Sequence, residues 1–269
     1  MILSSHRIAA EFGFTAVVAC ELEFYLYGSA QLDLADFWRE VRKRCERRSI
    51  GICKIEKEKG TDQHEVALMP ADSDKAIKDA VQLKDVLSKV AEIYGINVDF
   101  SAKPFADEPG SGLHIHLHLQ DNIGKNVFYK DDQNISEPLK YSIGGLLYWL
   151  PQTMHVFAPH PESYARYRAG GDHTPTTISW GANNRTVAIR LPDSERHLKR
   201  IEHRVAGADA DPAQVIENIL DAVYWGLTNK AQPGEQIYGN ANMDMYKLQK
   251  LPLSLDEAAL SLAPADAQN

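Results

Sequence analysis

Residues 110–119 read GSGLHIHLHL, and histidines stand at every second position: His114, His116 and His118. Leucine and isoleucine fill the positions between them. In a β-strand this alternation places the imidazoles on one face and the aliphatic side chains on the other. We therefore predict a strand with one polar face and one apolar face.

Three further segments, ACELEFYLY (19–27), QHEVALM (63–69) and KRIEHRV (199–205), also place charged side chains on a predicted strand. Taken singly, such a strand most often has a solvated face. If the four polar faces converge, however, one pocket holds several carboxylates, several arginines and a histidine. The residues of this predicted pocket are Glu21, Glu23, Glu65, His114, Arg200, Glu202 and Arg204.

Closely spaced carboxylates repel one another unless a cation or a basic group lies between them. An oxygen-rich set of ligands favours Mg²⁺ or Mn²⁺ over Zn²⁺. Three imidazoles at alternate positions of a strand also spread over about 13 Å, too far to share one tetrahedral zinc ion. At most one or two of the histidines then bind metal. The alternative that His116 and His118 are ordinary surface residues stays open.

The remaining patterns predict an α+β fold with a curved, largely antiparallel sheet flanked by helices. Capped or amphipathic runs predict helices at residues 5–12, 36–48, 72–95 and 211–229, and another from 136 that stops at Pro151. Strands are expected at 15–28, 63–69, 97–102, 175–180, 186–191 and 199–205, besides the histidine strand. We expect one domain over residues 1–269, with a frayed tail at 262–269.

Composition narrows the class of protein further. The net charge of −8 disfavours general binding to nucleic acid, and no apolar run reaches the roughly 20 residues of a membrane span. The three cysteines, Cys20, Cys45 and Cys53, lack metal-ligand spacing. We interpret them as reduced thiols of a cytoplasmic protein.

Arginines form a second group of candidate site residues: Arg166 and Arg168 in SYARYRAGGDH, and Arg185 and Arg190 in NNRTVAIRLP. Guanidinium groups bind carboxylate and phosphoryl oxygens with paired donors. Because Arg185 and Arg190 are five residues apart, they face opposite ways on a regular strand. They share a pocket only if the strand bends or one of them lies at its end.

Seven segments in this order resemble the catalytic domain of glutamine synthetase: ELEFYLY, QHEVAL, KPFADEPGSGLHIHLHL, GKNVF, YSIGGLLYWL, ESYARYRAGGDHTPTTISWGANNRTVAIRLP and RIEHRVAGADADPAQVIENIL. The resemblance runs from about residue 6 to about residue 260. It implies an ATP-dependent ligase that joins glutamate to ammonia or an amine through a γ-glutamyl phosphate. Arginines and metal ions suit that reaction because it brings several anions together.

The resemblance also implies a role for each matching residue. Glu21, His114 and Glu202 match ligands of the metal ion that holds the ATP phosphates, and Glu23 and Glu65 match ligands of a second ion near glutamate. His116 and Arg200 match positions beside ATP, while Gly110, Arg166 and Arg204 match contacts to glutamate. Arg185 and Arg190 match the pair facing the phosphate, and Asp172 matches the acceptor of the ammonia proton.

Several positions depart from the family pattern. Lys57 stands where a third carboxylate ligand is expected, unless a one-residue bulge brings Glu56 or Glu58 there instead. Pro109 replaces an asparagine, and Asp172 is one methylene shorter than the usual glutamate. No segment resembles the family's N-terminal β-grasp domain, which closes the site of a neighbouring subunit, or its C-terminal helical segment.

These departures leave three hypotheses. The chain is an active ligase, alone, as a homo-oligomer or completed by a full-length relative. Alternatively it is a degenerate relative that binds nucleotide or an amino acid, or regulates a full-length relative, without efficient turnover. The third hypothesis is an unrelated metal protein.

Overall fold

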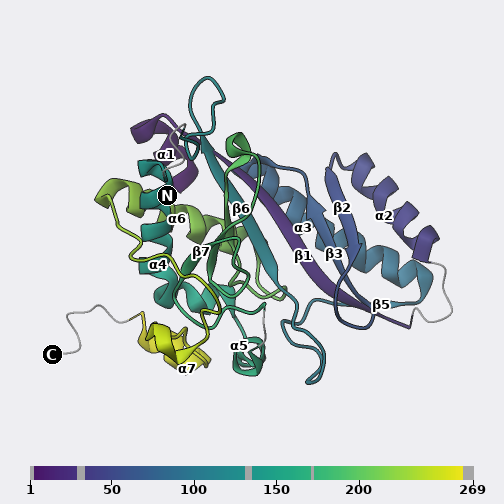
Figure 1. The fold of residues 1–269 in the computed structure, drawn as a ribbon. Coiled ribbons are helices and arrows are strands. Elements are labelled where there is room, and N and C mark those ends of the chain that lie inside the picture. Colours follow the sequence, from purple (N-terminus) through teal and green to yellow (C-terminus); the bar gives the residue numbers. More distant parts are fainter. Residues whose placement is uncertain (1–2, 29–33, 131–134, 171–172, 263–269) are drawn as a thin grey trace.

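Strands β1 (Thr15–Tyr27) and β6 (Leu113–Gln120) pair at the centre of the sheet shown in Figure 1. This computed structural model describes residues 3–28, 34–130, 135–170 and 173–262. Within them the sheet has nine strands in the order β2-β3-β1-β6-β9-β8-β7, with β4 and β5 also paired to β1. Among the strand pairs of these described ranges, only β7–β8 is parallel. The predicted α+β fold with a largely antiparallel sheet is confirmed.

The other strands are β2 (Ile52–Lys57), β3 (Gln63–Leu68), β4 (Ala71–Asp72), β5 (Asn97–Asp99), β7 (Trp180–Ala182), β8 (Ile189–Leu191) and β9 (Ile201–His203). Alternation along the two central strands sorts their side chains between the two faces of the sheet. Val18, Cys20 and Leu22 of β1 are buried in the same core cluster as Ile115 and Leu117 of β6. The polar residues between them point to the opposite face.

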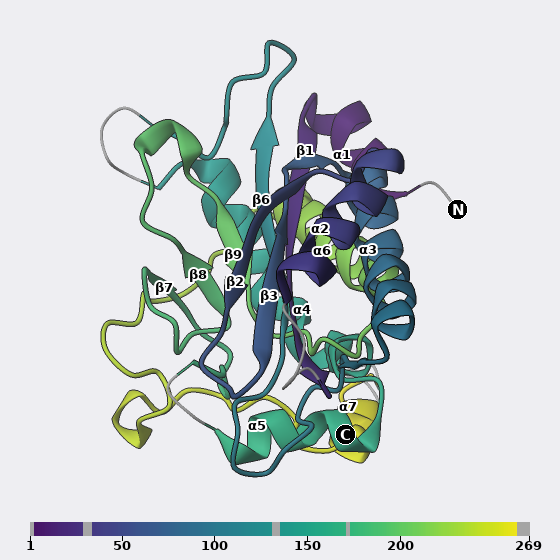
Figure 2. The same ribbon diagram turned by 90° about the vertical axis from the view of Figure 1, so that its right-hand side faces the viewer.

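Helices cover the apolar face of the sheet, so the polar face is left for the site (Figure 2). They are α1 (Ser4–Phe12), α2 (Leu34–Arg47), α3 (Ser73–Tyr94), α4 (Glu137–Phe157) and α6 (Pro212–Asn229). Capping side chains fix three of the starts, because Asp72, Ser136 and Asp211 each accept a hydrogen bond from a backbone N–H of the first turn. Two short helices, α5 (Ala165–Ala169) and α7 (Leu255–Leu260), lie outside this layer.

Two sequence-based expectations about elements are wrong. Helix α4 continues through Pro151 to Phe157, because Leu150 and Met154 on either side of the proline are buried in the core. That packing offsets the backbone hydrogen bond that proline removes. The strand expected at 175–180 begins only at Trp180, and Thr177 instead makes an isolated bridge to Lys250.

Of the predicted tail, only Leu262 belongs to the described residues. Among the helices of the described ranges, none combines the length and the apolar composition that a membrane span requires.

Candidate active site

A cavity of about 510 Å³ lies over the polar face of the sheet, and side chains from β1, β2, β3, β6, β8 and β9 line it. The strand register explains why they meet. Glu21 pairs with His114 across β1 and β6, and His116 pairs with Glu202 across β6 and β9. Glu23 pairs with Glu65 across β1 and β3. Directly opposed residues project from the same face of a sheet, so the polar rows of neighbouring strands converge.

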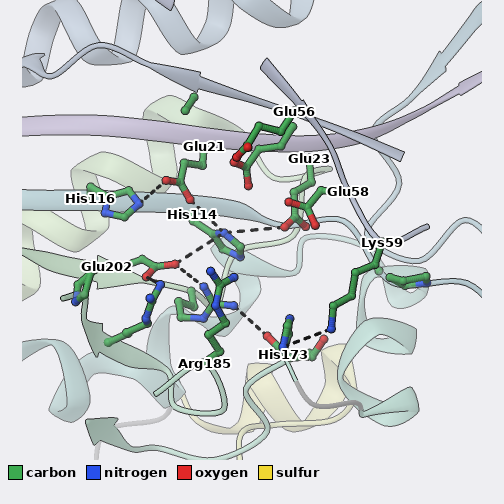
Figure 3. Close-up of a pocket in the computed structure, with 18 of the residues that line it drawn as sticks. Glu21, Glu23, Glu56, Glu58, Lys59, His114, His116, His173, Arg185 and Glu202 are labelled. Atoms are coloured by element: carbon green, nitrogen blue, oxygen red, sulfur yellow. Dashed lines mark hydrogen bonds and ion pairs between the residues drawn. The ribbon is translucent and has the colours of Figure 1, made fainter. Parts of the chain in front are cut away.

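One cluster of possible metal ligands consists of Glu21, His116 and Glu202, whose ligand atoms lie within 4.8 Å of one another; Glu21 also groups with Glu65 and His114 at the same spacing. His116 Nε2 is 2.8 Å from Glu21 Oε1 (Figure 3). The Nε–H of Arg200 donates to His116 Nδ1 at 3.0 Å. Arg200 thus orients the ring, and the close contact of His116 Nε2 with Glu21 holds that carboxylate beside it.

His114 stands between the carboxylates of both parts of the cavity. Its Nδ1 lies 3.7 Å from Glu21, 3.9 Å from Glu202 and 4.0 Å from Glu23. Its Nε2 is buried without a hydrogen-bond partner among the described residues. Glu21, His114 and Glu202, which the sequence analysis placed in one pocket, therefore do lie close together.

A second cluster brings Glu23, Glu58 and Glu65 within the same 4.8 Å. Glu58 belongs to it because of a bulge in β2: Ile52 pairs with Leu68, but Lys54 pairs with Ala67. The extra residue reverses which side chains face the cavity. Without it, Ile55 and Lys57 would oppose Glu65 and Gln63, and Lys57 would enter the site.

With the bulge, Glu56 pairs with Glu65, and both Glu56 and Glu58 line the cavity. Lys57 pairs with His64 on the other face and is exposed. Of the two alternatives that the sequence left open, the structure therefore has the bulge, which turns Lys57 away from the candidate metal site.

The electrostatics of the carboxylates differ between the two clusters. Burial, together with the neighbouring Glu21 and Glu23, raises the pKa of Glu65 to about 9. Burial would also raise the pKa of Glu202, but Arg204 and His114 outweigh it and hold that pKa at about 2. In the second cluster, burial and the neighbouring carboxylates outweigh the nearby positive charges and raise the pKa values of Glu58 and Glu65. A divalent cation with oxygen ligands fits this donor set and would relieve the repulsion.

Five arginines line the cavity, and two of them contact Glu202 directly. Arg190 Nη1 donates to Glu202 Oε2 at 2.6 Å, and Arg204 Nη1 donates to Glu202 Oε1. Arg166 is buried, and its Nη1 donates to the backbone oxygen of Val205 at 2.7 Å. Their charges are therefore fixed in place by neighbouring groups rather than by a ligand.

Glycines let the histidine strand approach these arginines. A Cβ at Gly110 would lie 2.9 Å from Arg166 Cγ. One at Gly112 would lie 2.7 Å from His114 Nε2 and 2.8 Å from Arg166 Nη2. Any side chain at Gly112 therefore displaces a candidate ligand and an arginine together.

The structure brings nearly all the sequence-predicted site residues to this cavity. Those that line it are Glu21, Glu23, Glu65, Gly110, His114, His116, Arg166, Arg185, Arg190, Arg200, Glu202 and Arg204. Arg185 and Arg190 both line it, because Arg185 lies in the turn before β8 rather than on the strand. Asp172 lies outside the described residues.

Other cavity residues were not identified as site residues from the sequence, among them Lys54, Lys59, Gln63 and His173. Glu58 was named only as an alternative to Lys57. Glu56 and Glu58 stand two residues apart, which indicates that they share one face of the strand. The sequence does not show whether that face is the one over the cavity, because no residue type marks the bulge.

His118 faces a neighbouring, more apolar cavity of about 620 Å³. Five residues, Glu21, Cys53, Ala67, His116 and Arg200, line both cavities and so form their junction; three of them, Glu21, His116 and Arg200, are acidic or basic. A small ligand that extends from one cavity into the other would pass these three side chains.

Comparison with known proteins identifies the architecture. Residues 29–267 match the family model for the glutamine synthetase catalytic domain. Among curated relatives, γ-glutamylputrescine synthetase PuuA of Escherichia coli (strain K12) is 41% identical over 165 residues, covering 61% of this chain and 35% of its own length. Glutamate–isopropylamine ligase of Pseudomonas sp is 31% identical over 280 residues, covering 93% of this chain and 61% of its own length.

A solved structure of a GmaS/ADP complex superposes with a TM-score of 0.86 at 26% identity, covering 96% of this chain and 66% of that one. This chain therefore spans between about a third and two thirds of the length of these relatives. Because the family model matches most of its residues, the chain belongs to the glutamine synthetase family and corresponds to that family's catalytic domain.

Proposed function

We propose that this chain is the catalytic part of an ATP-dependent ligase that joins the γ-carboxyl group of glutamate to ammonia or an amine. The observation that carries the proposal is the position of His114 between two carboxylate clusters in a cavity that five arginines also line. The names of two relatives, γ-glutamylputrescine synthetase and glutamate–isopropylamine ligase, support the class of product.

The proposed reaction has two steps. An oxygen of the glutamate γ-carboxylate attacks the γ-phosphorus of ATP, and the bond from that phosphorus to the bridging oxygen breaks to release ADP. The amine nitrogen then attacks the acyl carbon, phosphate leaves with the bonding electrons, and the nitrogen loses a proton. Both steps bring anionic oxygens together, so positive charge held in position lowers the barrier.

We assign the binding of metal ions and of substrates to different residues of the cavity. Glu21, His114 and Glu202 would hold one divalent ion, Mg²⁺ or Mn²⁺, and Glu23, Glu58 and Glu65 would hold another. When bound, these ions supply positive charge to the phosphate oxygens.

Side chains supply the rest of the binding. Arg185 and Arg190 would bind the transferred phosphoryl group, while Arg166, Arg204 and the backbone at Gly110 would bind the glutamate. His116 and Arg200 stand at the junction of the two cavities, which suits the phosphates of a nucleotide that occupies both. Asp172 remains the proposed acceptor of the amine proton.

An assay with ATP, Mg²⁺, glutamate and a panel of ammonia, isopropylamine and putrescine tests the proposal. ADP and the γ-glutamyl amide should appear together, detected by mass spectrometry. Arg185→Met should abolish both products. Arg168→Met is the matched control, because Arg168 is exposed and does not line the cavity. Absence of any amide from the wild-type chain would contradict the proposal.

One observation favours the alternative of a relative that binds without efficient turnover. Pro109 lines the cavity and has no backbone N–H to offer a substrate, and its carbonyl already accepts a hydrogen bond from Tyr25 at 2.8 Å. This alternative predicts that the chain binds ATP, as measured by calorimetry, but hydrolyses it slowly at most and forms little amide. The same assay therefore separates the two functions.

The proposal extends to location and assembly. We propose a cytoplasmic protein, a setting that suits the three cysteines, which are free thiols in the structure. We also propose that the chain associates with copies of itself or with a longer relative. Light scattering of the purified chain, with and without ATP and Mg²⁺, measures that association.

A further inference from the structure

The two ends of the active-site cavity have different surroundings. One end joins the neighbouring apolar cavity at Glu21, His116 and Arg200. The opposite end is bounded by Glu58, Lys59 and His173, which line the first cavity alone. In the proposed function, nucleotide occupies the junction. The amine therefore has to reach the acyl carbon from the opposite end.

A tight turn holds Lys59 at this opposite end. Glu58 N–H donates to the Gln63 carbonyl at 2.9 Å, and Gly60 N–H donates to the Gln63 side chain at 3.1 Å. A Cβ at Gly60 would lie 2.2 Å from the Tyr25 hydroxyl oxygen, so the turn is packed closely against β1. From this turn the Lys59 ammonium extends to within 3.3 Å of His173 Nε2 (Figure 3).

The carboxylates of the cavity already have partners or a proposed role. Five of them, Glu21, Glu23, Glu58, Glu65 and Glu202, belong to the two clusters. Glu56 Oε2 lies 2.5 Å from the Lys54 ammonium, and Asp193 Oδ2 accepts a hydrogen bond from Asn183 at 2.5 Å. Each carboxylate of the described residues that line the cavity therefore already has a partner or a proposed role in metal binding.

We propose that Lys59 makes this chain select monoamines or ammonia over diamines. The inference rests on the proposed function and names its amine. A diamine that presents one nitrogen to the acyl carbon must leave its other ammonium at the end of the cavity that Lys59 bounds. Lys59 is exposed at this end, and like charges repel there even where water and salt screen them, so this placement disfavours diamine binding.

Butylamine and putrescine form a matched pair of probes, because they share a four-carbon chain and differ by one amino group. The wild-type chain should have the higher kcat/KM for butylamine. Lys59→Met should raise the ratio of putrescine to butylamine kcat/KM about tenfold, through a lower KM for putrescine with kcat for butylamine unchanged. Lys59→Gln should act alike, and Lys59→Arg should keep the wild-type ratio.

Two further conditions separate a charge effect from a structural one. Lys78→Met removes an exposed lysine of α3 and should leave the ratio unchanged. Added salt should narrow the wild-type preference, because mobile ions screen charges near the cavity mouth.

The possible failures are distinguishable. An unchanged ratio in both neutral variants, or a wild-type preference for putrescine, refutes the role of Lys59 and leaves the ligase function intact. If the wild-type chain forms no γ-glutamyl amide from any amine, the proposed function fails and this inference fails with it.

Discussion

Replacing Glu58 by glutamine tests the bulge of β2 and the second carboxylate cluster together. Glu58, Glu23 and Glu65 place oxygens within 4.8 Å of one another. Two unit charges at that distance repel by about 3.5 kcal/mol at an effective dielectric constant of about 20. Protonation of Glu65, whose pKa is raised to about 9, relieves most of this repulsion in the metal-free protein. We therefore expect Glu58→Gln to stabilise the metal-free protein by about 1 kcal/mol, or about 3 °C in Tm.

The same substitution removes a negative oxygen from the candidate metal site. We expect the Kd for Mn²⁺ to rise between about tenfold and a hundredfold, a loss of about 1.4 to 2.7 kcal/mol. Metal-free stability and metal affinity therefore change in opposite directions. That combination is the signature of a ligand cluster, whereas a residue with only a structural role would lower stability in both forms.

Calorimetric titration with Mn²⁺ and thermal melts with and without metal measure both quantities. Lys57→Gln is the matched control, because Lys57 is the neighbouring residue and points to the other face of β2. It should change the Kd less than about threefold. If Lys57→Gln strengthens metal binding and Glu58→Gln has no effect, β2 is regular and the bulge argument is refuted.

Three other changes test separate parts of the site. Gly112→Ala should lower kcat/KM about a hundredfold and destabilise the chain by about 1 to 3 kcal/mol, because its Cβ would displace the buried His114 and Arg166. Near-normal activity would contradict that packing. Arg204→Met should destabilise the chain by about 3 kcal/mol in thermal melts, because the buried Glu202 loses one of its two arginine partners. An unchanged Tm would show that Arg190 alone is enough to stabilise the Glu202 carboxylate. Mg²⁺ and ATP together should raise Tm more than either alone, and at a hundredfold excess over Kd the stabilisation should be about 2.7 kcal/mol. A Tm that neither ligand changes would count against nucleotide binding.

Much of the site was predictable because β1 and β6 are regular over their central residues. Alternation alone fixed the faces of Glu21, Glu23, His114 and His116, and the register between the strands then placed Glu21 opposite His114. Sequence can supply such information wherever one face of a strand is apolar, since a slip by one residue would expose that face.

The errors arise where one local feature overrides periodicity. A single extra residue in β2 exchanges the faces of Lys57 and Glu58, and no residue type in ICKIEKEK marks where it falls. Pro151 predicted the end of a helix, but packing on both sides of it carries α4 onward. Both outcomes depend on tertiary contacts that a local pattern does not contain.

The two carboxylate clusters differ in how far the protein itself orders them. Glu21 is held by His116, and Glu202 by Arg190 and Arg204, so the first cluster keeps its geometry through groups of the chain. In the second cluster, Glu23 accepts a hydrogen bond from the Gly112 N–H at 2.6 Å. Its other carboxylates have raised pKa values, because burial and their carboxylate neighbours disfavour the charged form. The geometry of the second cluster therefore depends more on a bound cation. A ligand that brings a cation to these carboxylates would order their side chains more than the chain itself does.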